Sequence, residues 1–212
     1  ILGLPETLYS TFVLEEKYGF NKMDWKTFIS DSIKGMILAL VIGFPLLALI
    51  LYMMENLSSS WWLYAFVTIV LFQLLMIFIF PTYIAPLFNK FTPLEDETLK
   101  DRVVKLLERC DFKASGLFVM DASKRTGHGN AYFTGFGKNK RIVFFDTLLK
   151  NLDHEEVEAI LAHELGHFKR FHIYKMVIVS WISLFVGLFI LNLLMKTPSF
   201  YTGHGVLSQT HY

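Results

Sequence analysis

The fold of this chain is decided by an apolar run at residues 61–80, WWLYAFVTIVLFQLLMIFIF. The run contains no Lys, Arg, Asp or Glu, and a helix of about 20 apolar residues is long enough to cross the hydrocarbon core of a membrane. It opens with Trp61, Trp62 and Tyr64, aromatic residues of the kind that anchor a helix at the membrane interface. We therefore predict a transmembrane helix that stops at Pro81.

Two further runs, Ile33–Met54 and Ile173–Met195, are also long and apolar enough to span a membrane. Their only charged residues, Lys34 and Lys175, lie near their ends. The whole chain is 53% hydrophobic, with a mean hydropathy of +0.43. Three buried helices of a soluble protein are the alternative, but soluble folds rarely contain three such runs. We therefore predict a mainly α, polytopic membrane protein.

The overall charge and the cysteine content exclude several classes of function. The formal net charge is +1 over 212 residues, so there is no basic field of the kind that attracts nucleic acid. Cys110 is the only cysteine, which excludes an intrachain disulfide and a Cys-x-x-Cys metal or redox motif. Any metal ion is therefore expected to be held by histidine and carboxylate side chains.

The positions of the cations predict how the spans are oriented. Lys22 and Lys26 precede the first span, whereas residues 55–60, between the first two spans, contain no Lys or Arg. Cytoplasmic loops carry an excess of Lys and Arg. The loop 55–60 is therefore expected on the non-cytosolic side, and the polar region that ends with Lys169 and Arg170 is expected in the cytosol.

Five segments are expected along the chain. They are an N-terminal polar segment (1–32), two transmembrane helices (33–80), a cytosolic region (81–172), a third transmembrane helix (173–195) and an incomplete loop (196–212). Because the chain begins at Ile1 and ends in a polar run that completes no element, we expect it to be an internal part of a longer protein.

The cytosolic region has the pattern of a small α+β unit. Leu99, Val103 and Leu106 have helical spacing, which predicts an amphipathic helix over residues 97–110. Strands are expected at 117–120, 131–136 and 142–145, with residues 137–140 as the turn of a hairpin. Asp153, with Glu156 three residues later, predicts a capping box for a helix that continues through residues 169–170.

The strongest chemical signal is His163-Glu164-Leu165-Gly166-His167 inside that last helix. Residues four apart lie on the same helical face, so both imidazoles can reach one tetrahedral Zn²⁺. Glu164 can then take a proton from the attacking water and pass it to the leaving amine. Two surface histidines beside a salt-bridging glutamate are the alternative. We predict that His163 and His167 bind zinc and that Glu164 is the catalytic base of a metalloendopeptidase.

A zinc peptidase site needs a third protein ligand, usually histidine or glutamate. His172 lies five residues after His167 and would point in a different direction on a continuous helix, so we expect a supporting or structural role for it. No Asp or Glu follows it in the sequence. The third ligand is therefore expected beyond Tyr212.

Several longer stretches carry a family resemblance. They are Thr11–Val13, Glu15–Glu16, Gly19–Asn21, Tyr83–Leu94, Ser123–Arg125, Asn130–Phe133, Lys138–Val143, Phe145–Leu149 and His163–His167. In these stretches the chain resembles the integral-membrane type I CAAX prenyl protease family, zinc endopeptidases of eukaryotes that have bacterial relatives. The match extends over nearly the whole chain, which makes it more specific than the zinc motif alone.

The resemblance implies a fragment of a seven-helix membrane protease, with a cytosolic zincin-like α+β insert and a water-filled chamber. It implies Zn²⁺ as the cofactor and a glutamate on a later helix as the third ligand. The implied partners are the lipid bilayer and a peptide or prenylated CAAX protein, cut near its C-terminus. Nucleic acid is not an expected partner.

The resemblance also singles out residues outside the zinc motif. Asn130 matches the family's asparagine at the start of the strand beside the cleft, where a substrate backbone can align. A turn residue after Gly129 is the alternative. Glu15 and Glu16 match a family feature without an evident mechanism, so a solvated polar face is expected there.

Two other functions stay open on the sequence. A membrane quality-control zinc protease of the heat-shock type shares the zinc motif but not the Tyr83–Leu94 run. A non-catalytic membrane scaffold is the second. The expected location is the endoplasmic reticulum or inner nuclear membrane for a eukaryotic source, and the inner cell membrane for a bacterial one, which the short linker Lys150–His154 slightly favours.

Overall fold

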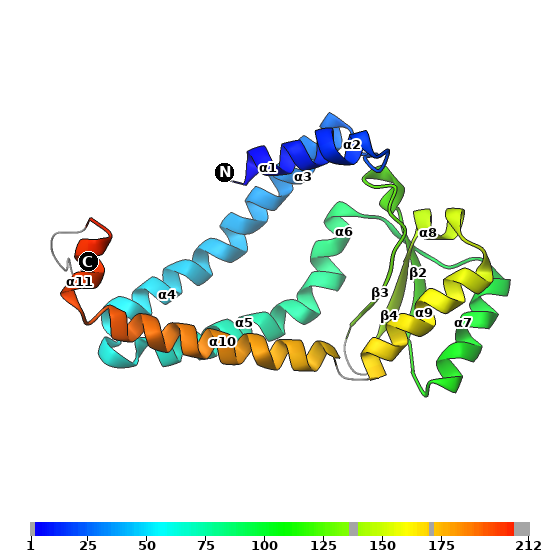
Figure 1. The fold of residues 1–212 in the computed structure, drawn as a ribbon. Helices are drawn as coiled ribbons and strands as arrows, with labels where there is room; N and C mark the ends of the chain where they lie inside the picture. The colour runs from blue at the N-terminus through cyan, green and yellow to red at the C-terminus, as the bar shows by residue number, and fades with distance from the viewer. Residues whose placement is uncertain (1–2, 136–139, 170–171, 206–212) are drawn as a thin grey trace. The chain divides into compact units, whose positions relative to one another are not determined.

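The computed structural model describes residues 3–135, 140–169 and 172–205 (Figure 1). By their contacts the residues of the chain form two compact units. The first comprises residues 1–34 and 77–170, and the second comprises residues 35–76 and 171–212. The first unit contains the predicted zinc helix, and the second contains most of the apolar helical sequence.

The first unit is built on a mixed sheet, whose strand order in the described residues is β1-β2-β4-β3. The strands are β1 (Phe91–Pro93), β2 (Gly116–Met120), β3 (Ala131–Thr134) and β4 (Arg141–Phe145). β2 and β4 are parallel, whereas β1 pairs antiparallel with β2, and β3 pairs antiparallel with β4. The pairing of β3 with β4 confirms the predicted hairpin, although residues 136–139, which include most of the predicted turn 137–140, lie outside the described residues. β3 forms one edge of the sheet.

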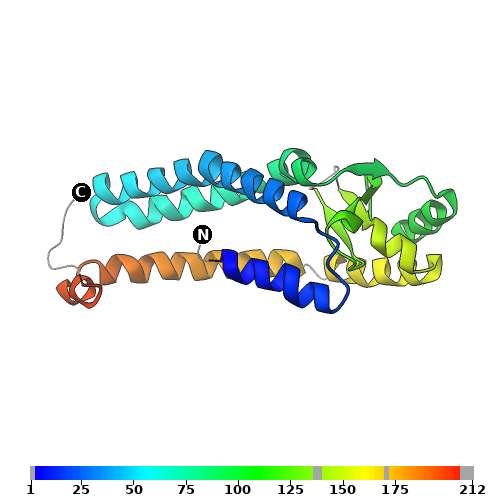
Figure 2. The ribbon, with the colours of Figure 1, turned by 90° about the horizontal axis from the view of Figure 1, so that it is seen from above.

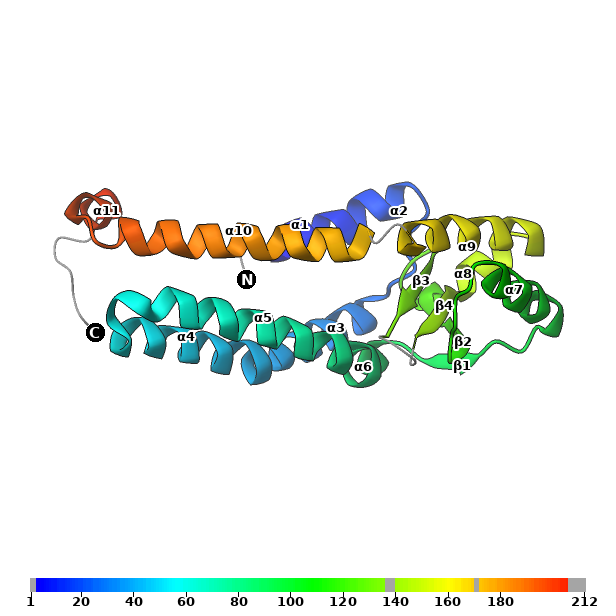
Figure 3. The same cartoon turned by 90° about the horizontal axis from the view of Figure 1, so that it is seen from below.

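Two helices cover one face of this sheet (Figures 1 and 3). They are α7 (Glu97–Arg109) and α9 (His154–Lys169), which contact each other. Leu99 of α7, Leu161 of α9 and Phe144 of β4 meet in one core and are each at most 2% exposed. Burial of an apolar side chain of this size contributes about 1.5–3 kcal/mol. This core confirms the predicted amphipathic helix and holds α9 on the sheet.

The second unit contains long apolar helices, the last two of which run side by side (Figures 1 and 2). They are α4 (Phe44–Asn56), α5 (Trp61–Ile79) and α10 (His172–Leu194). The indole of Trp62 on α5 contacts the ring of Phe185 on α10, with ring centroids 5.1 Å apart. The indole N–H of Trp181 donates a hydrogen bond of 2.7 Å to Oε1 of Gln73. Such polar side chains join helices in an apolar environment because they find no other partner there.

The helical runs that correspond to the three expected spans are Trp25–Asn56, Ser58–Phe88 and Lys175–Leu194. Each is long and apolar enough, by length and composition, to cross a membrane, and at most 6% of its apolar window is buried. Exposed apolar surface of this extent is what lipid or further membrane helices cover. Together with the mixed sheet, these helices confirm the predicted fold class.

The ends of two of these helical runs differ from the prediction. The first begins with α3 (Trp25–Leu38), well before the expected start at Ile33. The second does not stop at Pro81, because a π-helical turn, Phe80–Ile84, leads the chain past the proline into α6 (Ala85–Phe88). Such a wider turn accommodates a proline ring that would clash with the carbonyl four residues earlier in an α-helix.

The described residues also form four shorter α-helices. They are α1 (Leu4–Tyr9), α2 (Glu15–Lys17), α8 (Asp146–Asn151) and α11 (Pro198–Gly203). The sequence pattern did not predict them, and it did not predict β1.

Candidate functional site

Helix α9 carries the predicted zinc residues and begins at a capping box. The backbone N–H groups of Glu155 and Glu156 each donate to Oδ1 of Asp153 at 2.9 Å. In return, Oε2 of Glu156 accepts the N–H of Asp153 at 3.0 Å. The predicted helix start is therefore confirmed. The predicted continuation through Arg170 falls outside the described residues, since α9 is described to Lys169.

His163 and His167 lie one turn apart on the exposed side of α9. Their Nε2 atoms are 3.1 Å apart, and the ring planes are inclined at 80°. Two imidazole nitrogens bound to a tetrahedral zinc ion at about 2.0–2.1 Å would lie about 3.3–3.4 Å apart. The observed separation is close to that value. The histidine pair therefore fits one zinc ion held by its two Nε2 atoms.

The opposite side of α9 faces the core. Leu161 and Leu165 are at most 3% exposed, which leaves His163 and His167 on the outer side and Glu164 partly buried between the two sides. Among the described residues, no third His, Cys, Asp or Glu joins the pair in a group that could hold a metal ion. His172 begins α10, and its side chain lies outside the described part of the structure.

Asn130 directly precedes β3 at the edge of the sheet. Its backbone carbonyl accepts the N–H of Phe145 at 2.9 Å, and its side-chain Oδ1 accepts the N–H of Ala131 at 2.8 Å. Asn130 thus fixes the point where the chain enters the edge strand. The structure brings the two histidines together on α9. It places Asn130 in the same unit, immediately before β3, a strand that α9 contacts.

Comparison with known proteins assigns this arrangement to a family. Residues 93–211, which include α7, α8 and α9, match peptidase family M48. The chain belongs to peptidase family M48. Residues 1–90 match the CAAX prenyl protease N-terminal region, described as five membrane helices. These two matches confirm the resemblance to the type I CAAX prenyl protease family.

Relatives of this M48 chain are similar along most of its sequence. CAAX prenyl protease 1 of Saccharomyces cerevisiae is 43% identical over 206 residues, which cover 97% of this chain and 46% of that protein. The CAAX prenyl protease 1 homolog of Arabidopsis thaliana is 45% identical over 173 residues, which cover 81% of this chain and 41% of that protein. The crystal structure of S. mikatae Ste24p is 44% identical, with a TM-score of 0.88 over 95% of this chain and 47% of that one. The chain spans about half the length of the curated relatives it matches.

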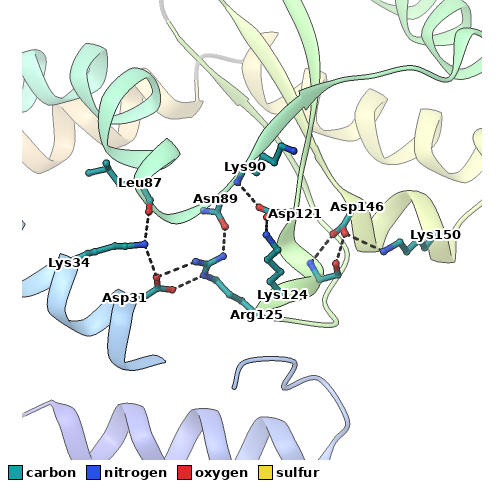
Figure 4. Close-up of polar contacts among 11 residues, drawn as sticks. Asp31, Lys34, Leu87, Asn89, Lys90, Asp121, Lys124, Arg125, Asp146 and Lys150 are labelled. Atoms are coloured by element: carbon teal, nitrogen blue, oxygen red, sulfur yellow. Dashed lines mark hydrogen bonds and ion pairs between the residues drawn. The ribbon is translucent and has the colours of Figure 1, made fainter. Parts of the chain in front are cut away.

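A polar network outside α9 joins Asp31, Lys34, Leu87, Asn89 and Arg125 (Figure 4). The guanidinium of Arg125 donates to both carboxylate oxygens of Asp31, at 2.8 and 3.2 Å, and to Oδ1 of Asn89 at 3.0 Å. Nζ of Lys34 donates to the carbonyl oxygen of Leu87 at 2.8 Å. Bidentate pairing with a carboxylate is the strong form of such an ion pair. The network ties α3 and the end of α6 to the loop that follows β2.

Asp31 and Lys34 were not predicted as site residues, although a signal was present. Both are ionisable residues within the long helical run that begins at Trp25. Charged residues in such a helix usually have a specific partner. Here the partners are Arg125 and the carbonyl group of Leu87.

Asp146 holds the same loop at Ser123 (Figure 4). It accepts hydrogen bonds from the N–H of Ser123 at 2.8 Å, from the Ser123 hydroxyl, and from Nζ of Lys150 at 3.2 Å. Burial acts to raise the pKa of Asp146, but the hydrogen bonds from Ser123 and the Lys150 ammonium outweigh it, so the pKa lies below its ordinary value. Asp146 is therefore ionised at neutral pH and ties the start of α8 to the turn at Ser123.

The two glutamates that were expected on a solvated face have partners. Oε2 of Glu16 accepts the side-chain N–H of Asn21 at 2.9 Å. Oε2 of Glu15 lies 2.9 Å from Nε2 of His128, a residue of the loop that leads to Asn130. The N-terminal segment of this M48 chain is therefore in contact with the loop that enters the edge strand.

Proposed function

We propose that this chain supplies the zinc-binding helix of an integral-membrane metalloendopeptidase. The observation that supports this function is the pair of Nε2 atoms, 3.1 Å apart, that His163 and His167 present on one face of α9 beside Glu164 in an M48 chain. A zinc ion held there, with a glutamate outside residues 1–212 as its third protein ligand, would act as a Lewis acid toward the attacking water.

The residues of this chain then have separate roles. His163 and His167 hold the metal through Nε2. Glu164 accepts a proton from the attacking water and delivers it to the leaving amine, as a general base and then a general acid.

The open edge of β3 is the proposed binding site for the peptide backbone. The bond from Phe145 N–H to the Asn130 carbonyl makes these two residues a hydrogen-bonded pair. In an antiparallel ladder the next residue, Ala131, and then Phe133 turn their backbone groups away from β4. An extended peptide can add along this edge as a further strand, and Asn130, whose Oδ1 accepts the Ala131 N–H, lies at the start of its binding site.

The proposed substrates are prenylated CAAX proteins, because the relatives that cover this chain almost fully are named CAAX prenyl proteases. The test is cleavage of farnesylated and unmodified CAAX peptides by the full-length protein in proteoliposomes. We expect faster cleavage of the farnesylated peptide, loss of cleavage with a zinc chelator, and recovery when zinc is returned. Equal cleavage of both peptides would favour a quality-control protease, and no cleavage of either would overturn the peptidase function.

We propose that residues 81–172 form the catalytic region on the cytosolic side and that residues 173–195 form a membrane span. The excess of Lys and Arg around these segments supports this orientation. The reported relatives come from yeast and plant sources, which supports a location in the endoplasmic reticulum or inner nuclear membrane over a bacterial inner membrane.

The proposed orientation predicts the accessibility of introduced cysteines. In a cysteine-free background, a cysteine at Ser59 should react with a membrane-impermeant maleimide added from the non-cytosolic side. A cysteine at Lys138 should react only from the cytosolic side. Sealed vesicles of known orientation provide the measurement, and permeabilised vesicles provide the control in which both sites react. Labelling of both from the same side would contradict the proposed orientation.

A further inference from the structure

The loop that leads to the proposed substrate strand pairs with a segment from the N-terminal part of the chain. The N–H of Gly127 donates to the carbonyl oxygen of Phe20 at 2.7 Å, and the N–H of Lys22 donates to the carbonyl oxygen of Arg125 at 3.2 Å. An isolated antiparallel bridge joins Asn21 to Thr126. The N-terminal segment therefore adds a short backbone pairing to this loop.

Two side chains of the same segment hold His128. The imidazole stacks on the ring of Phe20, with centroids 4.0 Å apart and planes inclined at 18°. Its Nε2 lies 2.9 Å from Oε2 of Glu15. The carbonyl oxygen of Glu15 accepts the N–H of Phe20 at 2.9 Å, across a turn in which Gly19 has a φ of +74°. A positive φ of this size suits glycine, so the turn brings Glu15 and Phe20 to the same imidazole. We call Glu15, Phe20 and His128 the N-terminal brace.

The chain between the brace and Asn130 is short and tightly held. The carbonyl oxygen of His128 accepts the hydroxyl of Thr147 at 2.7 Å. Gly129 passes so close to α8 that a Cβ atom there would lie 3.1 Å from Cδ1 and 3.2 Å from Cα of Leu148. Asn130 is then bonded to Phe145 and to the N–H of Ala131. Because each of these residues is held by close contacts, a displacement of His128 is expected to displace the edge of β3 as well.

We propose that the N-terminal brace positions Asn130 and the open edge of β3 for the backbone of the peptide substrate. Glu15 and Phe20 act through His128 and are positioning residues, which do not touch the substrate. The inference rests on the proposed peptidase function, because it assigns the brace to substrate binding by the same site. It predicts that loss of the brace weakens substrate binding and leaves the zinc residues on α9 unchanged.

The test uses the full-length protein with Phe20→Ala, His128→Ala and the milder Glu15→Gln. We expect KM for the farnesylated peptide to rise roughly tenfold in the alanine variants, equivalent to about 1.4 kcal/mol of binding free energy, with kcat within about twofold. Zinc content should not change. Phe20→Tyr, which keeps the stacked ring, should restore KM. Tyr18→Ala is the matched control, since Tyr18 belongs to the same turn and its side chain is exposed.

Binding measured separately from turnover distinguishes this proposal from the function on which it rests. In a Glu164→Gln background, the Kd of a fluorescent farnesylated peptide should rise with Phe20→Ala and His128→Ala but not with Tyr18→Ala. If the wild-type protein binds the peptide but does not cleave it, the proposed function fails while the binding data still test the brace. Unchanged Kd and KM in the brace variants would overturn the proposal. A fall in zinc content and kcat together, with KM unchanged, would also overturn it and would show a purely structural role.

Discussion

Replacement of Glu164 by glutamine in the full-length protein is expected to abolish turnover and leave zinc bound. His163 and His167, whose Nε2 atoms lie 3.1 Å apart, are both unchanged in this variant, so the two metal ligands on α9 remain. Glutamine has nearly the same size but cannot accept the proton of the attacking water. General base catalysis contributes about 10²–10⁴-fold to a rate, so kcat should fall by at least that factor. Zinc content and kcat, measured on the same preparation, provide the check.

A matched substitution on the same helix separates this effect from a general disturbance of α9. Glu155→Gln removes a carboxylate whose side chain is 80% exposed and pairs with Arg102 at 3.3 Å. Exposed ion pairs contribute about 0–1 kcal/mol, so this variant should keep nearly full activity. Residual activity of Glu164→Gln within about tenfold of wild type, a difference of only 1.4 kcal/mol in the barrier, would contradict the role of Glu164 as the base.

The parts of the fold that the sequence predicted are those fixed by local pattern. The apolar spans follow from length and composition, and the helix α7 follows from the spacing of Leu99, Val103 and Leu106. The start of α9 follows from Asp153 and Glu156, which lie three residues apart and bond reciprocally. The histidine pair could also be predicted from local pattern, because two side chains four residues apart on a helix point to the same face.

The parts that the sequence did not predict depend on contacts between distant residues. β1 has three residues and ends in Pro93, so its strand character comes from pairing with β2. α8 has only six residues, and its first residue, Asp146, is bonded to Ser123, 23 positions earlier. The partners Asp31 and Arg125 are 94 residues apart, and Glu15 and His128 are 113 apart. No local pattern could indicate these pairs.

The prediction for Asn130 depends partly on local sequence pattern and partly on contacts between distant strands. Its position before a strand could be inferred from the aromatic and β-branched residues that follow it. Whether β3 would lie inside the sheet or at its edge depends on the strand order β1-β2-β4-β3, which involves a parallel pairing of β2 with β4. Only the edge position leaves backbone groups open to an added peptide strand. The proposed role of Asn130 in substrate binding therefore relies on the sheet topology.

A chain limited to residues 1–212 is expected to bind zinc weakly and to lack peptidase activity. His163 and His167 supply two ligands of a tetrahedral shell, whereas catalytic zinc sites normally have three protein ligands. In the described part of the chain no third His, Cys, Asp or Glu joins the two histidines. A missing ligand lowers affinity and also removes part of the geometry that orients the attacking water toward Glu164.

The measurement is zinc per chain after dialysis, together with cleavage of the farnesylated peptide, for the 212-residue chain beside the full-length protein. The short chain should retain well under one zinc, and the little that it binds should disappear with His163→Ala, because that variant leaves a single imidazole on α9. Helix content measured by circular dichroism controls for folding, since α9 is held on the sheet by Leu161 and Leu165 and not by the metal. Stoichiometric zinc with normal turnover in the short chain would show that the third ligand lies within residues 1–212. Alanine substitution of His172, His204 and His211 in turn would then identify it, because these are the histidines that follow α9 in the sequence.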